Sequence, residues 1–150
     1  MKNIKYWLPS IIIMVIIFLA SNDPASGEKS DFITRFIWHF INSLTGYQAT
    51  AIDEGTTTFI IRKTAHVSEY TILAISFFYA LFKTFLKNSG FYKIYFLTVI
   101  LSVFYSSSDE FHQSVVAGRV GTYEDVLIDT VGILISIFIL PFLYKRLKKS

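Results

Sequence analysis

Long apolar runs separated by short polar segments dominate the chain. Four runs approach the roughly 20 residues that a helix needs to cross a bilayer, and they cover about residues 6–20, 59–82, 91–107 and 126–144. The runs are too long, and alternate too little, for the strands of a membrane barrel. Helices then remain as the structure that satisfies every backbone polar group in lipid. The pattern therefore predicts an all-α membrane protein, a bundle of four transmembrane helices in a single domain over residues 1–150.

The first run has a second interpretation. Its basic head and apolar core, "MKNIKYWLPSIIIMVIIFLASND", are also typical of a cleaved signal peptide. The position after Ala20 lacks the small-x-small pattern of a cleavage site, because Phe18 precedes Leu19 and Ala20. We therefore expect the run to be a retained helix.

A shorter helix of about 14 residues is predicted between the first two runs, where Asp31 can cap the start and Gly46 the end. It is too short and too polar to span a bilayer, so we expect it to lie in the interface with Trp38 at headgroup level. There it either packs as a lid over the bundle or touches a ligand, and His39 is interpreted as an interfacial polar side chain. The apolar residues at helical spacing are Phe32, Ile33, Phe36, Ile37, Phe40, Ile41 and Leu44.

Composition supports lipid as the solvent. Apolar residues make up 53% and charged residues 17% of the chain, against about 25% charged in soluble domains. A soluble domain of this size could not bury so much apolar surface. The absence of cysteine excludes disulfides and thiolate metal ligands.

Basic residues predict the orientation, because short cytoplasmic loops are enriched in Lys and Arg. Three places are basic: the head of the first run, the link between the second and third runs, and the tail "YKRLKKS". With four spans all three share one side, so we expect a multi-pass cell-membrane protein with both termini in the cytoplasm. The residues are Lys2, Lys5, Lys83, Lys87, Lys93, Lys145, Arg146, Lys148 and Lys149.

Polar side chains concentrate at the opposite ends of the predicted helices. In the second helix, Arg62, His66 and Glu69 share one face, and Lys63 lies beside them. A charged acid near a helix centre costs about 2.5–3.5 kcal/mol on insertion scales, so Glu69 should face protein or water.

The third and fourth helices add to the same end. Asp109, His112 and Gln113 are spaced to share a face, as are Asp125 and Asp129, and Arg119 lies between them in a turn with Gly118 and Gly121. Ser21 and Asn22 end the first helix on this side. Gly132 and Ser136 continue the aspartate face as small residues that permit close helix contact.

Three segments resemble the VanZ-like family of membrane proteins: "FLASNDPASGEKS" (18–30), "RKTAHVSEYTILA" (62–74) and "SDEFHQSVVAGRVGTYEDVLIDTVG" (108–132). The resemblance implies a four-helix membrane fold and, for the founding member, a link to low-level resistance to glycopeptide antibiotics such as teicoplanin. The motif residues carried over to this chain are Arg62, Lys63, His66, Glu69, Asp109, Glu110, His112, Gln113, Arg119, Asp125 and Asp129.

One hypothesis is a recognition site for an anionic lipid or a lipid-linked cell-envelope component at the outer leaflet. Arg62, Lys63 and Arg119 would hold a phosphate, and the other ligand-binding candidates are Gln113, Asp125 and Asp129. The expected partners are membrane lipids, a lipid-linked cell-wall precursor or an anchored polymer.

A second hypothesis is a membrane-embedded enzyme for phosphoryl or ester chemistry. Its catalytic candidates are His66, Glu69, Asp109 and His112, which could act as acid and base or hold a divalent cation together with the aspartates. A third interpretation gives the same residues no chemistry: the basic and acidic side chains neutralise each other and staple the helix ends. Transport is disfavoured by the lack of an inverted repeat. No nucleic-acid partner is expected, because the lysine-rich tail is explained as an anchor at anionic lipid.

Overall fold

The computed structural model describes residues 3–86 and 88–149, and most of these residues are helical. The elements are α1 (Leu8–Ser21), α2 (Ser26–Thr45), α3 (Ala51–Leu81), α4 (Phe91–Gln113), α5 (Tyr123–Ile135) and α6 (Leu140–Lys149). Short irregular helical turns cover Ile4–Tyr6, Phe82–Leu86 and Ser136–Phe138. No strand occurs in the part of the chain that the structure describes. The prediction of an all-α membrane protein is confirmed.

Two helical segments, Ala51–Phe85 and Phe91–Gln113, are long and apolar enough to cross a membrane by themselves. Two further pairs qualify if each bent pair is one span: α1 with α2, bent by 87°, and Tyr123–Phe138 with α6, bent by 47°. The fold therefore has two to four candidate spans.

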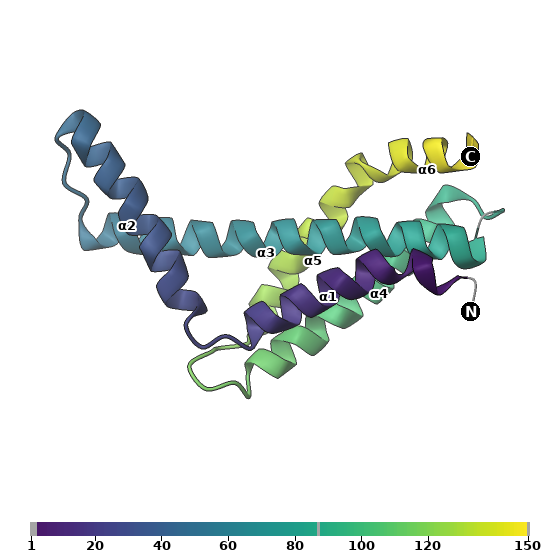
Figure 1. The fold of residues 1–150 in the computed structure, drawn as a ribbon, viewed down its shortest axis with the longest axis horizontal. Coiled ribbons are helices and arrows are strands. Elements are labelled where there is room, and N and C mark those ends of the chain that lie inside the picture. Colours follow the sequence, from purple (N-terminus) through teal and green to yellow (C-terminus); the bar gives the residue numbers. More distant parts are fainter. Residues whose placement is uncertain (1–2, 87, 150) are drawn as a thin grey trace.

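Helix α3 is the centre of the bundle (Figure 1), where it packs against α1, α4 and α5. Fully buried Tyr70, Leu73 and Ala74 of α3 meet Ile17 of α1 and Ile133 of α5 in one apolar core. A second core near the far end of α3 gathers Phe78, Leu81, Phe82, Ile94, Leu140 and Leu147.

Gly132 brings α5 unusually close to α3, as its position on the small-residue face predicts. A Cβ at Gly132 would lie 2.3 Å from the carbonyl oxygen of Val67. The Thr71 hydroxyl of α3 lies 2.7 Å from the Gly132 carbonyl oxygen and equally close to the Val67 carbonyl oxygen of its own helix. This close backbone contact leaves α5 little freedom to move relative to α3, and so fixes the positions of side chains one turn away on both helices.

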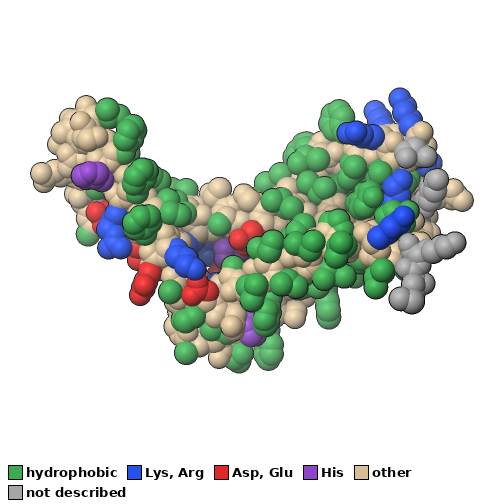
Figure 2. All heavy atoms as spheres, viewed as in Figure 1, with side chains coloured by type: hydrophobic (Ala, Val, Ile, Leu, Met, Phe, Trp, Pro, Cys, Tyr) green, Lys and Arg blue, Asp and Glu red, His purple; other side chains and the backbone are tan. Residues whose placement is uncertain are grey.

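Both termini and the α3–α4 turn lie at one end of the molecule, whereas the α1–α2 and α4–α5 connections lie toward the other (Figure 1). Basic side chains gather at the end with the termini (Figure 2). This arrangement agrees with the expected common side for the basic segments, of which Lys2 and Lys87 lie outside the described residues. The cytoplasmic location of that end stays a prediction.

The boundaries of the predicted spans need correction. The helix α1 starts at Leu8 and has 14 residues, so alone it is shorter than the expected span. Helix α3 begins eight residues before the predicted 59–82 run, at Ala51, and α4 continues to Gln113. The predicted 126–144 span is not continuous. Pro141, which lacks an N–H for the preceding turn, lies in the first turn of α6 just after the break.

Helix α2 begins at Ser26 rather than at Asp31 and has 20 residues, while its end at Gly46 is as predicted, with a left-handed φ of 72°. Asp31 instead accepts a hydrogen bond from Thr58 of α3 at 3.1 Å.

The face that α2 turns toward α3 is its polar one. Thr34 lies 2.8 Å from Thr58 between hydroxyl oxygens, and the Trp38 indole donates to Thr57 at 3.1 Å. Its apolar side chains point outward, with Phe32, Phe36 and Leu44 at least 67% exposed. We call α2 and the first half of α3 the α2–α3 arm. It projects away from the bundle (Figure 1), so α2 is not a lid over it.

Candidate functional site

The polar ends of α1, α4 and α5 meet the middle of α3 where the α2–α3 arm joins the bundle. Helix α3 brings residues 62–69, α4 brings 106–113, α5 brings 125–129, and α1 contributes Ser21 at its end. The positions in α1, α4 and α5 adjoin the connections 22–25 and 114–122, whereas residues 62–69 lie in the middle of α3. The structure therefore brings together side chains that are distant in the chain, although residues 62–69 lie in the middle of α3 rather than at the helix start that the sequence predicted.

His66 and Asp129 face each other across the α3–α5 contact. The His66 Nδ1 atom lies 3.1 Å from Asp129 Oδ1, and the Ser106 hydroxyl of α4 donates to the other Asp129 oxygen at 2.6 Å. Asp129 is fully buried. One carboxylate thus ties three helices together.

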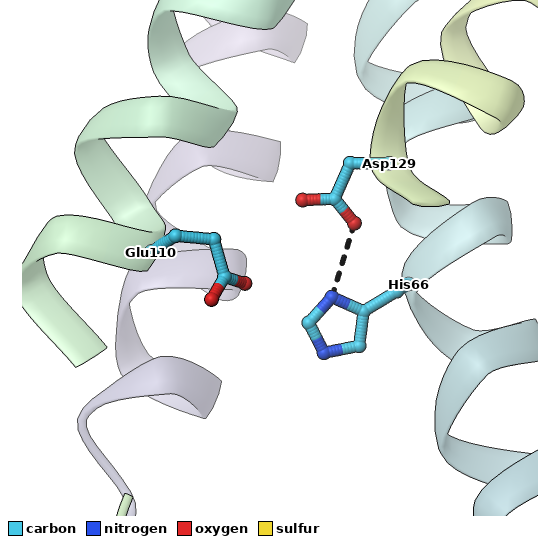
Figure 3. Close-up of side chains that lie close together, drawn as sticks. All are labelled: His66, Glu110 and Asp129. Atoms are coloured by element: carbon cyan, nitrogen blue, oxygen red, sulfur yellow. Dashed lines mark hydrogen bonds and ion pairs between the residues drawn. The ribbon is translucent and has the colours of Figure 1, made fainter. Parts of the chain in front are cut away.

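Glu110 completes this cluster from α4. One of its oxygens accepts from the Gln113 amide at 3.2 Å, and the other from the backbone N–H of Thr122 at 3.1 Å. Its carboxylate points toward His66 and Asp129 (Figure 3). One ligand atom from each of His66, Glu110 and Asp129 falls within 4.8 Å of the other two.

Asp109 links α1, α3 and α4 through hydrogen bonds. Its Oδ2 atom accepts from Ser21 at 2.9 Å, Tyr70 at 3.2 Å and Gln113 at 2.9 Å. The side chain is buried, and its Oδ1 atom has no hydrogen-bond partner among the described residues. These contacts assign Asp109 and Gln113 to the framework that holds the helix ends together.

The turn after α4 is held against that helix by close backbone contact. Gly118 has a φ of 80°, in the left-handed region that favours glycine. A Cβ at Gly121 would lie 1.9 Å from the Glu110 carbonyl oxygen, so a side chain there cannot be accommodated. This geometry presents Arg119 to α2 and α4: its guanidinium donates to Gln113 Oε1 at 2.6 Å and to the hydroxyl of Ser26.

Lys63 and Asp125 form an ion pair between α3 and α5. Their side chains are 24% and 11% exposed, so the pair is largely shielded from water. Thr122 caps the start of α5 by accepting from the Asp125 backbone N–H at 3.2 Å. For these two residues the geometry matches the helix staple, and the Lys63 ammonium is already paired with a carboxylate.

A cavity of about 110 Å³ opens between the α2–α3 arm and the bundle. Figure 2 shows charged and histidine side chains together at this hollow. Both arginines of the candidate site line it, as do His66 and Glu69, which confirms that positions 62, 66 and 69 share one face of α3. The complete lining is Ala20, Ser21, Ser26, Ser30, Arg62, Ala65, His66, Glu69 and Arg119.

His112 is separated from the other candidates. Its ring stacks on Phe18 of α1, with ring centroids 4.8 Å apart, and its Nε2 atom has no partner among the described residues. It lines neither the cavity nor the cluster around Asp129. The expected common face of Asp109, His112 and Gln113 is therefore split.

The face of α4 that does point inward carries Ser106, Glu110 and Gln113. Their spacing of four and then three residues is the signal that could have identified Glu110 as a site residue. Sequence reasoning placed Glu110 in the family motif but gave it no role in the site.

Comparison with known proteins adds one match. A family model described as VanZ/LLP1 matches residues 6–144, which include every helix that contributes to the site. Among curated proteins and among solved structures, none matches the chain.

Proposed function

Because the chain belongs to the VanZ/LLP1 family of membrane proteins, we propose that its cavity binds the phosphate of an anionic amphiphile at the membrane surface. One observation carries the proposal. Arg62 and Arg119 line the same cavity, and neither forms an ion pair with a carboxylate within residues 3–86 and 88–149. Guanidinium groups are fixed forks of donors that match phosphate oxygens in pairs.

The other walls of the cavity support the same ligand. The hydroxyls of Ser21, Ser26 and Ser30 line it and can donate hydrogen bonds to phosphate oxygens. The first turn of α2 starts at Ser26, and the N–H groups at a helix start favour an anion. Lys63 drops out of the earlier hypothesis, because Asp125 already neutralises it.

The size of the cavity limits what it encloses. Pockets that surround a drug-sized ligand measure roughly 300–1,000 Å³, whereas this cavity measures about 110 Å³. It suits a phosphate group whose hydrocarbon chains stay outside. Ile16 and Leu19, in the turn of α1 before the lining residues Ala20 and Ser21, are 56% and 61% exposed and offer such chains a surface.

Glu69 restricts which headgroups suit the cavity. Its carboxyl group lines the same cavity as the two arginines. A carboxylate repels a bare phosphate but accepts a hydrogen bond from a hydroxyl or an amine. The preferred ligand therefore carries a phosphate and a neighbouring donor, as phosphatidylglycerol does. With both termini in the cytoplasm, the cavity would face the outer leaflet, where lipid-linked cell-wall precursors and anchored polymers are also found.

Binding of phosphatidylglycerol by the purified full chain in detergent tests the proposal, with native mass spectrometry as the readout. Arg62→Gln is the main variant, because Arg62 is exposed and makes no hydrogen bond within the described residues. A charge-assisted hydrogen bond contributes about 1.5–3 kcal/mol, so we expect at least about tenfold weaker binding. Arg119→Lys, which keeps the charge but loses the fork, should also weaken binding.

Arg35→Gln is the matched control. Arg35 is an exposed arginine of α2 that does not line this cavity. Unchanged binding by folded Arg62→Gln and Arg119→Lys, or an equal loss in Arg35→Gln, would refute a specific phosphate site and leave only general attraction to anionic lipid.

A further inference from the structure

The polar end of the bundle contains more buried carboxyl groups than basic side chains that pair with them. Asp109 and Glu110 are 4% exposed and Asp129 is 0% exposed. Within the described residues, the sole ionisable base in contact with any of these carboxyl groups is His66, since Lys63 pairs with Asp125. Buried carboxylates without a cation cost several kcal/mol each. Such a cluster either takes up protons or takes up a cation.

Three of the side chains are arranged for a cation. His66 from α3, Glu110 from α4 and Asp129 from α5 point into one space between the helices (Figure 3). We propose that these residues bind a divalent transition-metal ion. Metal–ligand bonds to nitrogen and carboxylate oxygen measure about 2.0–2.2 Å, so ligands lie up to about 4 Å apart across the ion. The present separations, at most 4.8 Å, require only a small inward movement of side chains.

The types of ligand atom restrict which metal ions suit the site. One imidazole nitrogen with two carboxylate oxygens suits Zn²⁺ or Mn²⁺ better than Mg²⁺ or Ca²⁺, which prefer oxygen alone. Soft metals that need thiolate are excluded, since the chain has no cysteine. A proton shared by His66 and Asp129 across 3.1 Å is the group that a bridging metal would displace.

The residues around the cluster hold its carboxylates in place. Ser106 donates to Asp129, while Gln113 and the Thr122 N–H donate to Glu110. Outer contacts of this kind orient metal ligands and raise affinity. Three protein ligands also leave coordination positions open, as in catalytic rather than structural metal sites. His66 lines the cavity with the arginines, so an open position has access to whatever the cavity holds.

This metal site goes beyond the proposed phosphate site and does not depend on it. Its test needs no lipid: Mn²⁺ is titrated into the purified full chain in detergent, and the bound ion is followed by electron paramagnetic resonance. We expect one Mn²⁺ per chain, competition by Zn²⁺, and at least tenfold weaker binding in Glu110→Gln and in Asp129→Asn. The matched control is Glu28→Gln, an exposed acid of α2, which should bind as the unmodified chain does.

A second measurement keeps the test decisive if both variants fail to fold. Pulsed electron paramagnetic resonance of Mn²⁺ on the unmodified chain should show coupling to an imidazole nitrogen. The chain has three histidines, so the coupling must survive His39→Gln and His112→Gln.

Three results would overturn the site: no Mn²⁺ or Zn²⁺ bound by the folded chain up to millimolar concentration, equal binding by folded Glu110→Gln, or bound Mn²⁺ without nitrogen coupling. The first would mean that the carboxyl groups are protonated and act only as a helix staple. Arg62→Gln should keep its metal, so loss of lipid binding and loss of metal binding are separately visible.

Discussion

The close approach of α5 to α3 at Gly132 makes a sharp prediction for Gly132→Ala. The new methyl group would lie 2.3 Å from the Val67 carbonyl oxygen, a backbone atom that no side-chain rotation can move. Ordinary contact begins at 3.4 Å, so the helices must separate by about 1 Å, and overpacking of this kind costs about 1–3 kcal/mol. The Thr71 hydroxyl lies 2.7 Å from the carbonyl oxygens of both Gly132 and Val67, so it keeps the Val67 partner when the helices separate and adds little to this cost.

We therefore expect Gly132→Ala to lower the free energy of unfolding by about 1–3 kcal/mol, measured by unfolding in mixed detergent micelles. Gly55→Ala is the matched control, because nothing lies within 4 Å of a Cβ built there. Replacing an unhindered helix glycine should stabilise the protein by about 0.5–1 kcal/mol. If Gly132→Ala unfolds at the same detergent composition as the unmodified chain, the reasoning from close backbone contact is wrong.

Three further outcomes are expected. Lys63→Met should lower the free energy of unfolding by about 1–3 kcal/mol, because it leaves the shielded Asp125 carboxylate without its cation. Adding Asp125→Asn should recover part of that loss, and strictly additive effects of the two changes would argue against the ion pair. Thr58→Val removes hydrogen bonds between α3 and α2, which contribute about 1 kcal/mol, and should speed amide hydrogen exchange along α2. Unchanged exchange would show that other contacts hold α2 against α3. In this cysteine-free chain, an environment-sensitive dye on Phe36→Cys should report an apolar surrounding in bilayers and on Glu28→Cys an aqueous one, and similar signals would contradict lipid contact by the outward face of α2.

Much of the fold was readable because apolar runs of helical length have few alternatives in lipid. Helix α4 starts at Phe91 as predicted, and α2 ends at Gly46, where the left-handed C-cap favours glycine. The break before α6 was missed, although Pro141 carries its signal. Periodicity averages over a run and does not register a single missing N–H.

The orientation of α2 was harder to predict. Its apolar stripe is plain in the sequence, but assigning that stripe to a packing surface assumes water on the other side. In a membrane protein lipid can cover the stripe, and the polar face with Thr34 and Trp38 packs on α3 instead.

The sequence predicted which residues belong to the candidate site better than it predicted which of them contact one another. His66, Glu69 and Arg119 do line one cavity, because the spacing along α3 fixes a common face. The partner from α4 depends on how that helix is rotated about its axis, which small buried residues such as Ser102 and Ser106 set through packing. A rotation of 100° per residue separates Glu110 from its neighbour Phe111 and still further from His112, so the spacing of Asp109, His112 and Gln113 favoured the wrong face, whereas that of Ser106, Glu110 and Gln113 matches the one observed.

The length of α3 links the site to the thickness of the membrane. Its 31 residues extend about 46 Å at 1.5 Å per residue, whereas the hydrocarbon layer measures about 30 Å. The surplus of about 16 Å has to be taken up by tilting or by standing clear of the acyl chains. Since Arg62 lies a third of the way along this helix, a thinner or thicker bilayer shifts the depth at which its guanidinium meets the headgroup layer. If α3 spans the bilayer, bilayer composition would thereby act on this protein mechanically, independently of any lipid bound in the cavity.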